Sequence, residues 1–246
     1  MTSTFRRDLY AGKTVVVVGG TSGVGAGIAR AFVDCGAKVI ATGATAEELE
    51  ASELHDVEHC TLQRLDVRDD GAVRAAIGAV DRLDVLVNCA GVIQRGLEHD
   101  PEVFASVLDI NLTGTMRGCA AARPLLAGRG GCIVNTASML SFFGGGLVPG
   151  YSASKGGIVQ LTKSLAIAYA AEGIRVNAVA PGWIATALTQ PLQDDRARSS
   201  TILGRTPLAR WGTPADVAGA VLFLCSPAAA FVTGVVLPVD GGYLVS

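Results

Sequence analysis

The hydrophobic residues of the chain fall into short apolar runs that alternate with longer stretches of helical spacing. The runs are rich in Val, Ile, Leu and Ala and predict seven strands, at residues 14–18, 38–42, 60–65, 83–89, 132–137, 175–180 and 235–239. Between these runs, apolar positions recur with the period of an amphipathic helix. Strands that alternate with helices form right-handed βαβ units. The pattern therefore predicts an α/β fold with a doubly wound, parallel sheet covered by helices on both faces.

Residues suited to helix ends support this interpretation. Asp100-Pro101 and Thr213-Pro214 each combine an N-cap residue with a proline that fits the first helical position. Gly173 is suited to end the helix that precedes it, because glycine adopts the left-handed conformation of a C-terminal cap. Helices are therefore expected to begin at 101 and 214 and to end near 173.

The chain is expected to form one domain, residues 1–246. Half of its residues are hydrophobic, which is enough for a large core, and no linker, repeat or low-complexity tract divides it. The segment 188–205 is polar and weakly periodic. We expect it to be either a mobile lid over a substrate site or an ordinary surface helix with its loops.

A glycine-rich turn follows the first predicted strand, in Gly19-Gly20-Thr21-Ser22-Gly23-Val24-Gly25, and a helical pattern follows the turn. Strand, glycine turn and helix is the order that a dinucleotide site requires. Gly19 permits the tight turn, Gly23 lets the backbone approach a pyrophosphate, and Gly25 lets the helix pack on the strand with its N-terminal amides towards the anion. The alternative is an ordinary turn between a strand and a helix.

Candidate acid/base chemistry lies in Tyr151-Ser152-Ala153-Ser154-Lys155. Four residues apart on a helix, the Tyr151 and Lys155 side chains stand one above the other. We expect the ammonium to favour the phenolate and to lower the pKa of Tyr151 from about 10. Ser138 follows a strand at the edge where open α/β sheets bind ligands. Taken singly, these residues also fit a surface ion-dipole pair and a turn serine.

Composition excludes several classes of function. A net charge of −2 without a cluster of Lys and Arg argues against nucleic acid. No apolar stretch approaches the roughly 18 residues of a membrane span and no leader is visible, so we expect a cytoplasmic protein without a membrane partner. The six cysteines show no C-x-x-C spacing and are expected to be reduced and structural, with no metal site.

Six motifs in chain order resemble those of the short-chain dehydrogenase/reductase family. They are Gly19-x-x-x-Gly23-x-Gly25, Asn88-Cys89-Ala90-Gly91, Asn111 in Asn111-Leu112-Thr113-Gly114, Ser138, Tyr151-x-x-x-Lys155 and Pro181-Gly182. The resemblance extends from about Gly12 to Gly242. It implies a single-domain Rossmann-type sheet and an NAD(P)-dependent oxidoreductase that interconverts a secondary alcohol and a ketone by hydride transfer.

The resemblance implies roles for four catalytic residues. Tyr151 exchanges a proton with the substrate oxygen, and Lys155 lowers the Tyr151 pKa and holds the ribose hydroxyls of the cofactor. Ser138 binds the substrate oxygen, where charge develops. Asn111 interrupts a long helical pattern and anchors a water relay to Lys155; the alternative is an Asn that only kinks the helix.

The cofactor-binding residues that the resemblance implies lie at the ends of the strands and in the loops after them. They are Gly19, Thr21, Ser22, Gly23, Val24, Gly25, Gly43, Asp66, Val67, Asn88, Ala90, Gly91, Tyr151, Lys155, Pro181, Gly182, Ile184 and Thr186. Asp66 and Val67 are expected at the adenine ring, although Asp66 equally fits a solvated turn. Ile184 and Thr186 are expected at the nicotinamide carboxamide.

The choice between NAD and NADP is left open by the second strand. Gly43 ends that strand where an acidic residue binds the ribose 2′-hydroxyl of NAD, and Ala44 follows where NADP enzymes often have Arg. With neither a carboxylate nor a cation at these positions, both cofactors are permitted, and we favour NAD slightly. Two further departures from the family pattern, Val18 for Thr and Cys89 for Asn, affect local structure more than chemistry.

The substrate is suggested by a second resemblance, to the 2-deoxy-/2-keto-3-deoxy-gluconate dehydrogenase branch. The residues that carry it are 137–142, 148–149, 205, 207 and 210–212. A sugar acid carries a carboxylate, for which Arg95 is the candidate cation; Arg95 equally fits an exposed loop charge. Met139, Leu140 and Trp183 suggest an apolar pocket rim. That rim favours the alternative, a 3-oxoacyl-carrier-protein reductase or general ketone reductase.

A third alternative is a non-catalytic module that binds NAD(P) as a redox sensor, since a fold does not fix a function. Such a module has no need of Asn111, Ser138, Tyr151 and Lys155 together, so their joint presence favours an enzyme. The resemblance also implies a homotetramer with contacts from the helices around Asn111 and Tyr151 and from the apolar C-terminal run.

Overall fold

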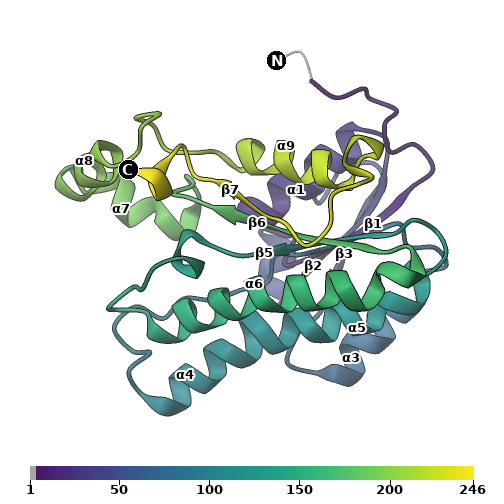
Figure 1. Ribbon diagram of the computed structural model, residues 1–246, viewed down its shortest axis with the longest axis horizontal. Helices are drawn as coiled ribbons and strands as arrows, with labels where there is room; N and C mark the ends of the chain where they lie inside the picture. The colour runs from purple at the N-terminus through teal and green to yellow at the C-terminus, as the bar shows by residue number, and fades with distance from the viewer. Residues whose placement is uncertain (1–3) are drawn as a thin grey trace.

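Seven parallel strands form the centre of the computed structural model, which describes residues 4–246 (Figure 1). The strands are β1 (Thr14–Val18), β2 (Lys38–Gly43), β3 (Cys60–Arg64), β4 (Val85–Asn88), β5 (Cys132–Thr136), β6 (Arg175–Pro181) and β7 (Val236–Val239). Their spatial order is β3-β2-β1-β4-β5-β6-β7. The strand order reverses between β1 and β4, the position at which open α/β sheets bind ligands. The predicted Rossmann-type sheet is confirmed.

Helices cover both faces of this sheet. They are α1 (Gly23–Asp34), α2 (Ala46–Glu50), α3 (Asp70–Gly78), α4 (Pro101–Leu108), α5 (Gly114–Leu126), α6 (Pro149–Tyr169), α7 (Gln190–Asp194), α8 (Arg196–Gly204) and α9 (Pro214–Cys225). Figure 1 shows α1 and α9 on one face and α3 to α6 on the other. The predicted helix ends are confirmed: Asp100 accepts the Glu102 and Val103 amides, Thr213 accepts the Asp216 amide, and Gly173 has a φ of +74°.

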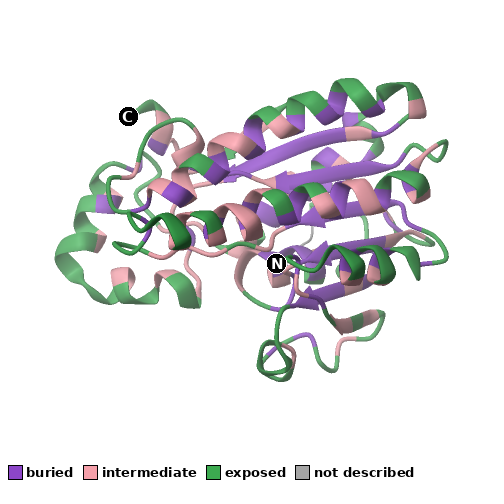
Figure 2. Cartoon of the chain, turned by 90° about the horizontal axis from the view of Figure 1, so that it is seen from below, coloured by how far each residue is buried: buried purple, intermediate pink, exposed green. Residues whose placement is uncertain are grey.

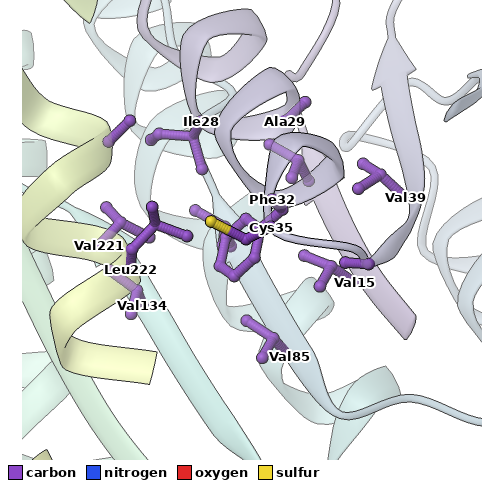
Figure 3. Packing of buried hydrophobic residues seen from close by; sticks show 14 of the residues in the cluster. Val15, Ile28, Ala29, Phe32, Cys35, Val39, Val85, Val134, Val221 and Leu222 are labelled. Carbon is purple, nitrogen blue, oxygen red and sulfur yellow. The ribbon is translucent and has the colours of Figure 1, made fainter. Parts of the chain in front are cut away.

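The central strands are buried (Figure 2), because the side chains of a strand such as β1 alternate between two apolar cores. Val15 and Val17 of β1 pack with α1 and α9, whereas Val16 and Val18 pack with α3, α5 and α6. Phe32 of α1 is fully buried in the first core (Figure 3). Complete burial of one such side chain contributes about 1.5–3 kcal/mol, so a sheet apolar on both faces holds the layers together.

The predicted lid segment, 188–205, is helical. It comprises the end of a 3₁₀ turn (Ala187–Thr189), then α7 and α8. These helices lie apart from the sheet, near the C-terminus (Figure 1). Trp211 Nε1 donates to Ser199 Oγ at 3.0 Å and fastens α8 to the loop before α9.

Membrane-spanning helices and groups of metal ligands are both expected, from the sequence, to be absent. Between residues 4 and 246, no helix combines the length and the apolar character that crossing a membrane requires. Within the same residues, no group of three or more His, Cys, Asp and Glu side chains is arranged as a metal site.

Candidate active site

The glycine turn after β1 packs so tightly against neighbouring backbone that two of its positions have no room for a side chain. Gly19 has a φ of +74°, and a Cβ on it would stand 2.4 Å from the Ala90 nitrogen. A Cβ on Gly25 would stand 2.0 Å from the Gly19 carbonyl oxygen. Ser22, the N-cap of α1, makes no capping hydrogen bond, and the first turn holds no acidic residue. The N-terminal amides of α1 therefore remain available to an anion, as the pyrophosphate of a dinucleotide requires.

Two charged side chains that sequence analysis missed lie at the end of β2. Glu48 Oε2 accepts the Ala44 amide at 2.7 Å and lies 3.0 Å from where a Gly43 Cβ would stand. Arg64 Nε donates to the Ala44 carbonyl at 3.2 Å. Gly43 and Ala44 carry no charge of their own, but a carboxylate and a guanidinium from elsewhere in the chain lie next to them. Glu48 comes from α2, and Arg64 pairs in register with Gly43 across β2 and β3.

Asp66 and Val67, expected at the adenine ring, follow β3. The Asp66 carboxylate is paired with the Arg68 guanidinium at 2.6 Å, and this hydrogen bond holds the pKa of Asp66 below its usual value. Val67 is buried against Gly114 of α5. Arg68 therefore occupies much of the acceptor capacity of Asp66, and the role of Asp66 towards adenine stays a prediction.

The end of β4 meets the catalytic candidates. Asn88 is buried and donates to Asn135 Oδ1 on β5 at 2.9 Å. A Cβ on Gly91 would stand 3.3 Å from Asn111 Oδ1 and 3.6 Å from Lys155 Nζ. The loop Asn88 to Gly91 therefore passes close to two of the proposed catalytic side chains.

Asn111 lies in a π-helical segment, Asp109–Thr113, between α4 and α5. Its side chain is fully buried, exchanges hydrogen bonds with the Val92 backbone at 2.8 and 2.9 Å, and donates to Ser154 Oγ at 3.1 Å. The expected break in the helical pattern is thus a π-bulge, a feature that is frequent at functional sites. The relay to Lys155 stays a prediction.

Tyr151 and Lys155 come from the first two turns of α6, and Ser138 follows β5. Lys155 Nζ lies 5.6 Å from the centre of the Tyr151 ring and donates to the Thr136 carbonyl at 2.7 Å. Ser138 and Lys155 are buried. The structure therefore brings the phenol, the ammonium and the hydroxyl together at the carboxyl edge of the sheet.

The expected direction of the Tyr151 pKa is wrong for the protein alone. Burial raises the pKa of Tyr151, and the hydrogen bond with Ser138 lowers it by less. Burial also lowers the pKa of Lys155 to about 8. Desolvation disfavours the charged form of each group, and it is the largest influence on the pKa of both.

The segment after β6 closes the site from the other side. Pro181 ends β6, and a Cβ on Gly182 would stand 2.5 Å from Asp240 Cα. Ile184 is buried and bridges to Gly212, while the Thr186 methyl carbon lies 3.5 Å from where a Gly23 Cβ would stand. The proposed nicotinamide contacts and the glycine turn are therefore neighbours.

An open cavity of about 410 Å³ lies between the loop before α4 and the helices α7 and α8. Arg95, Leu147 and Trp183 line it on one side. Helices α7 and α8 line it with Leu192, Ala197, Arg198, Thr201 and Ile202. Of the four predicted substrate residues, Arg95 and Trp183 therefore lie at this cavity. Met139 is buried, Leu140 is partly buried, and neither lines the cavity.

Comparison with known proteins agrees with this geometry. A family model described as enoyl-(acyl carrier protein) reductase matches residues 18–244. A 2-dehydro-3-deoxy-D-gluconate 5-dehydrogenase of Bacillus subtilis is 42% identical over 95% of both chains. A galactitol 2-dehydrogenase of Cereibacter sphaeroides is 39% identical over 98% of this chain and 97% of its own.

Solved structures point the same way. A gluconate 5-dehydrogenase of Burkholderia cenocepacia, solved with NADP and tartrate, superimposes with a TM-score of 0.89 at 32% identity, over 98% of each chain. The fold and the length of the chain thus agree with relatives that match almost end to end. The chain belongs to the short-chain dehydrogenase/reductase family and is an NAD(P)-dependent oxidoreductase that interconverts a secondary alcohol and a ketone.

Proposed function

We propose that the substrate is a small hydroxy acid or keto acid related to the sugar acids, and that Arg95 binds its carboxylate. The observation that carries this proposal is the cavity beside Arg95, which a second cation, Arg198 of the lid, also lines. Arg198 is engaged by Asp195 at 3.3 Å, whereas Arg95 has no ion-pair partner within residues 4–246. A planar guanidinium binds a carboxylate through two parallel hydrogen bonds.

The names of relatives add support. The Bacillus subtilis relative is a dehydrogenase of a deoxy sugar acid, and the Burkholderia cenocepacia structure holds tartrate, a dicarboxylate. The alternative substrate, an acyl thioester or plain ketone, is favoured by Leu147, Leu192 and Ile202, which give the same cavity an apolar lining. The charge on the substrate therefore discriminates between the two proposals.

Each of the proposed catalytic residues has a separate role in the reaction. The nicotinamide supplies or accepts the hydride. Tyr151 gives a proton to the carbonyl oxygen during reduction or takes it from the alcohol during oxidation, and the Ser138 hydroxyl holds the same oxygen. Lys155 holds the ribose hydroxyls with its buried ammonium, and its charge adds to the stabilisation of the phenolate. Asn111 fixes the loop at Val92 and the α6 residue Ser154 next to them.

A substrate panel tests the proposal. The purified protein is mixed with NADH or NADPH and with keto acids, each paired with a neutral ketone of similar size, while nicotinamide absorbance is followed. We expect turnover of keto acids in preference to their neutral partners. Preference for the neutral partners would favour the acyl or ketone alternative.

Arg95→Ala is expected to raise KM for the preferred keto acid about 10- to 100-fold, because a hydrogen bond to a charged group contributes about 1.5–3 kcal/mol. Turnover of a neutral ketone by the same variant serves as the control and should change little. Equal losses on both substrates would show that Arg95 has a structural role instead of binding a carboxylate.

We propose that NAD is the preferred cofactor, although the Burkholderia cenocepacia relative was solved with NADP. The support is Glu48, whose carboxylate lies beside Gly43 where an acidic residue on β2 would bind the ribose 2′-hydroxyl. A carboxylate there also repels a 2′-phosphate. Arg64 lies at the same strand end and acts in the opposite sense.

Glu48→Gln is expected to strengthen NADPH binding relative to NADH binding about tenfold, equivalent to about 1.4 kcal/mol. Nicotinamide fluorescence measures both dissociation constants without any substrate. Glu47→Gln, at an exposed neighbouring position on α2, is the matched control. If the ratio is unchanged while Arg64→Ala weakens NADPH binding, the preference is for NADP.

We also propose that the protein acts in the cytoplasm as a homotetramer. The cytoplasm keeps thiols reduced, and all six cysteines are unpaired. Large apolar side chains, Ile167 of α6 and Phe231 near the C-terminus, are exposed in the single chain, as expected of surfaces that pack against other subunits. Sedimentation at the mass of a monomer would contradict the tetramer.

A further inference from the structure

Glu98, in the loop before α4, is a fully buried carboxylate that sequence analysis did not single out. Its Oε1 accepts the Gln94 amide and its Oε2 accepts the Tyr151 amide, each at 2.7 Å. Within residues 4–246 it has no cationic partner. Removing a carboxylate from water is costly, so its place between two backbone amides requires an explanation.

The N-terminus of α6 lacks a cap of its own. The N-cap residue is Val148, whose side chain makes no hydrogen bond, and Pro149 follows it. Tyr151 contributes one of the free amides of the first turn, which Glu98 satisfies from outside the helix. A Cβ on Gly150 would stand 3.3 Å from Glu98 Oε2, so a small residue lets the carboxylate approach. Glu98 therefore caps α6 at the residue that carries the phenol.

The other oxygen of Glu98 holds the backbone of the loop that carries Arg95. Gln94, whose amide it accepts, directly precedes Arg95, which lines the cavity. Glu98 thus links the backbone of Tyr151, the proposed acid/base residue, to the backbone next to Arg95, the residue proposed to bind the substrate.

Glu98 also acts on the phenol through its charge. Three groups act on or face the Tyr151 side chain: Glu98, Lys155 with Nζ 5.6 Å from the ring centre, and the Ser138 hydroxyl. The negative charge of Glu98 raises the pKa of Tyr151, because it opposes formation of the phenolate. Ser138 acts in the other direction.

We propose that Glu98 is a positioning residue of the active site: it fixes the Tyr151 end of α6 against the Arg95 loop and holds a negative charge near the phenol. The inference rests on the proposed acid/base role of Tyr151. Glu98 acts through the backbone of Tyr151 and through space, without contact to the substrate.

Two variants separate position from charge. Glu98→Gln keeps the length of the side chain but removes the charge and leaves one acceptor oxygen for the two amides, whereas Glu98→Asp keeps the charge and is one methylene too short to hold both amides. We expect kcat to fall on the order of tenfold in each, because small displacements of a catalytic group are costly, while the dissociation constant of NADH stays within about twofold. Glu102→Gln, at an exposed position on α4, is the control.

The pH dependence distinguishes the charge from a merely structural effect. Alcohol oxidation needs the phenolate and rises as Tyr151 loses its proton. Removal of the Glu98 charge makes that loss easier, so the rising limb of Glu98→Gln should move to lower pH, whereas that of Glu98→Asp stays in place. The near-ultraviolet absorbance of the phenolate, taken as the difference from Tyr151→Phe, shows the same shift without substrate.

Each result decides the inference. An unshifted limb in Glu98→Gln, or wild-type kcat in Glu98→Asp, overturns it. If Glu98→Gln does not fold, Glu98→Asp alone decides, since a fall in kcat with unchanged NADH binding supports the positioning role and wild-type kcat refutes it. Full activity of Tyr151→Phe, by contrast, would refute the proposed function itself, so the two failures are distinguishable.

Discussion

Tyr151→Phe is expected to lower kcat by about 10²- to 10⁴-fold, the usual contribution of a positioned general acid or base, and to leave NADH binding nearly unchanged. The substitution removes only the phenolic oxygen. The backbone amide of Tyr151 still donates to Glu98, and Lys155 still donates to the Thr136 carbonyl, so the fold of the site should persist. Steady-state kinetics with the best substrate of the panel, together with nicotinamide fluorescence for binding, measures both effects.

The control for this variant is the same substitution at the other end of α6. Tyr169→Phe removes a phenolic oxygen from a buried ring that packs under the Arg123 guanidinium, remote from the cluster of Ser138 and Lys155. Its activity should stay near that of the wild type. If Tyr151→Phe and Tyr169→Phe had equal activity, Tyr151 could not be the residue that exchanges the proton.

The sheet and the catalytic cluster could be predicted because they depend on local sequence. Strand positions follow from apolar runs such as 14–18, whose valines face two cores in alternation. The pairing of Tyr151 with Lys155 follows from the period of a helix. The break at Asn111 was also visible, because Asn is a poor helix former, although the π-bulge that results was not.

The missed residues depend on contacts between distant or irregular segments. Glu48 reaches the end of β2 from the short helix α2, and Arg64 reaches it through the register of β2 with β3. Glu98 lies in a loop, where a charged residue is ordinarily exposed. Nothing in the sequence around Glu98 indicates that its side chain is buried and accepts the amide of Tyr151, 53 positions later.

The error in the Tyr151 pKa has the same origin. The spacing of Tyr151 and Lys155 shows that a charge is near, but it does not show how completely water is excluded. In the folded protein desolvation is the largest influence on both groups, and it acts on them in opposite senses. Proximity can be predicted from a motif, whereas burial depends on the packing of the whole site.

Gly25→Ala is expected to weaken NADH binding about 10- to 100-fold and to destabilise the fold. The added Cβ would stand 2.0 Å from the Gly19 carbonyl oxygen, a backbone atom that cannot rotate away. The glycine turn must therefore shift, and the N-terminal amides of α1 move with it. Forcing an extra carbon into a packed region costs about 1–3 kcal/mol, and each 1.4 kcal/mol of lost binding energy is a tenfold change.

Gly219→Ala separates the turn from a general effect of replacing glycine. Gly219 lies inside α9, and its Cβ would meet no atom within 4 Å. Because alanine is the better helix former, this variant should be as stable as the wild type or up to about 1 kcal/mol more stable, with unchanged NADH binding. Thermal unfolding and nicotinamide fluorescence on both variants make the comparison. If Gly25→Ala bound NADH as tightly as Gly219→Ala does, the pyrophosphate of the dinucleotide could not lie against the turn after β1.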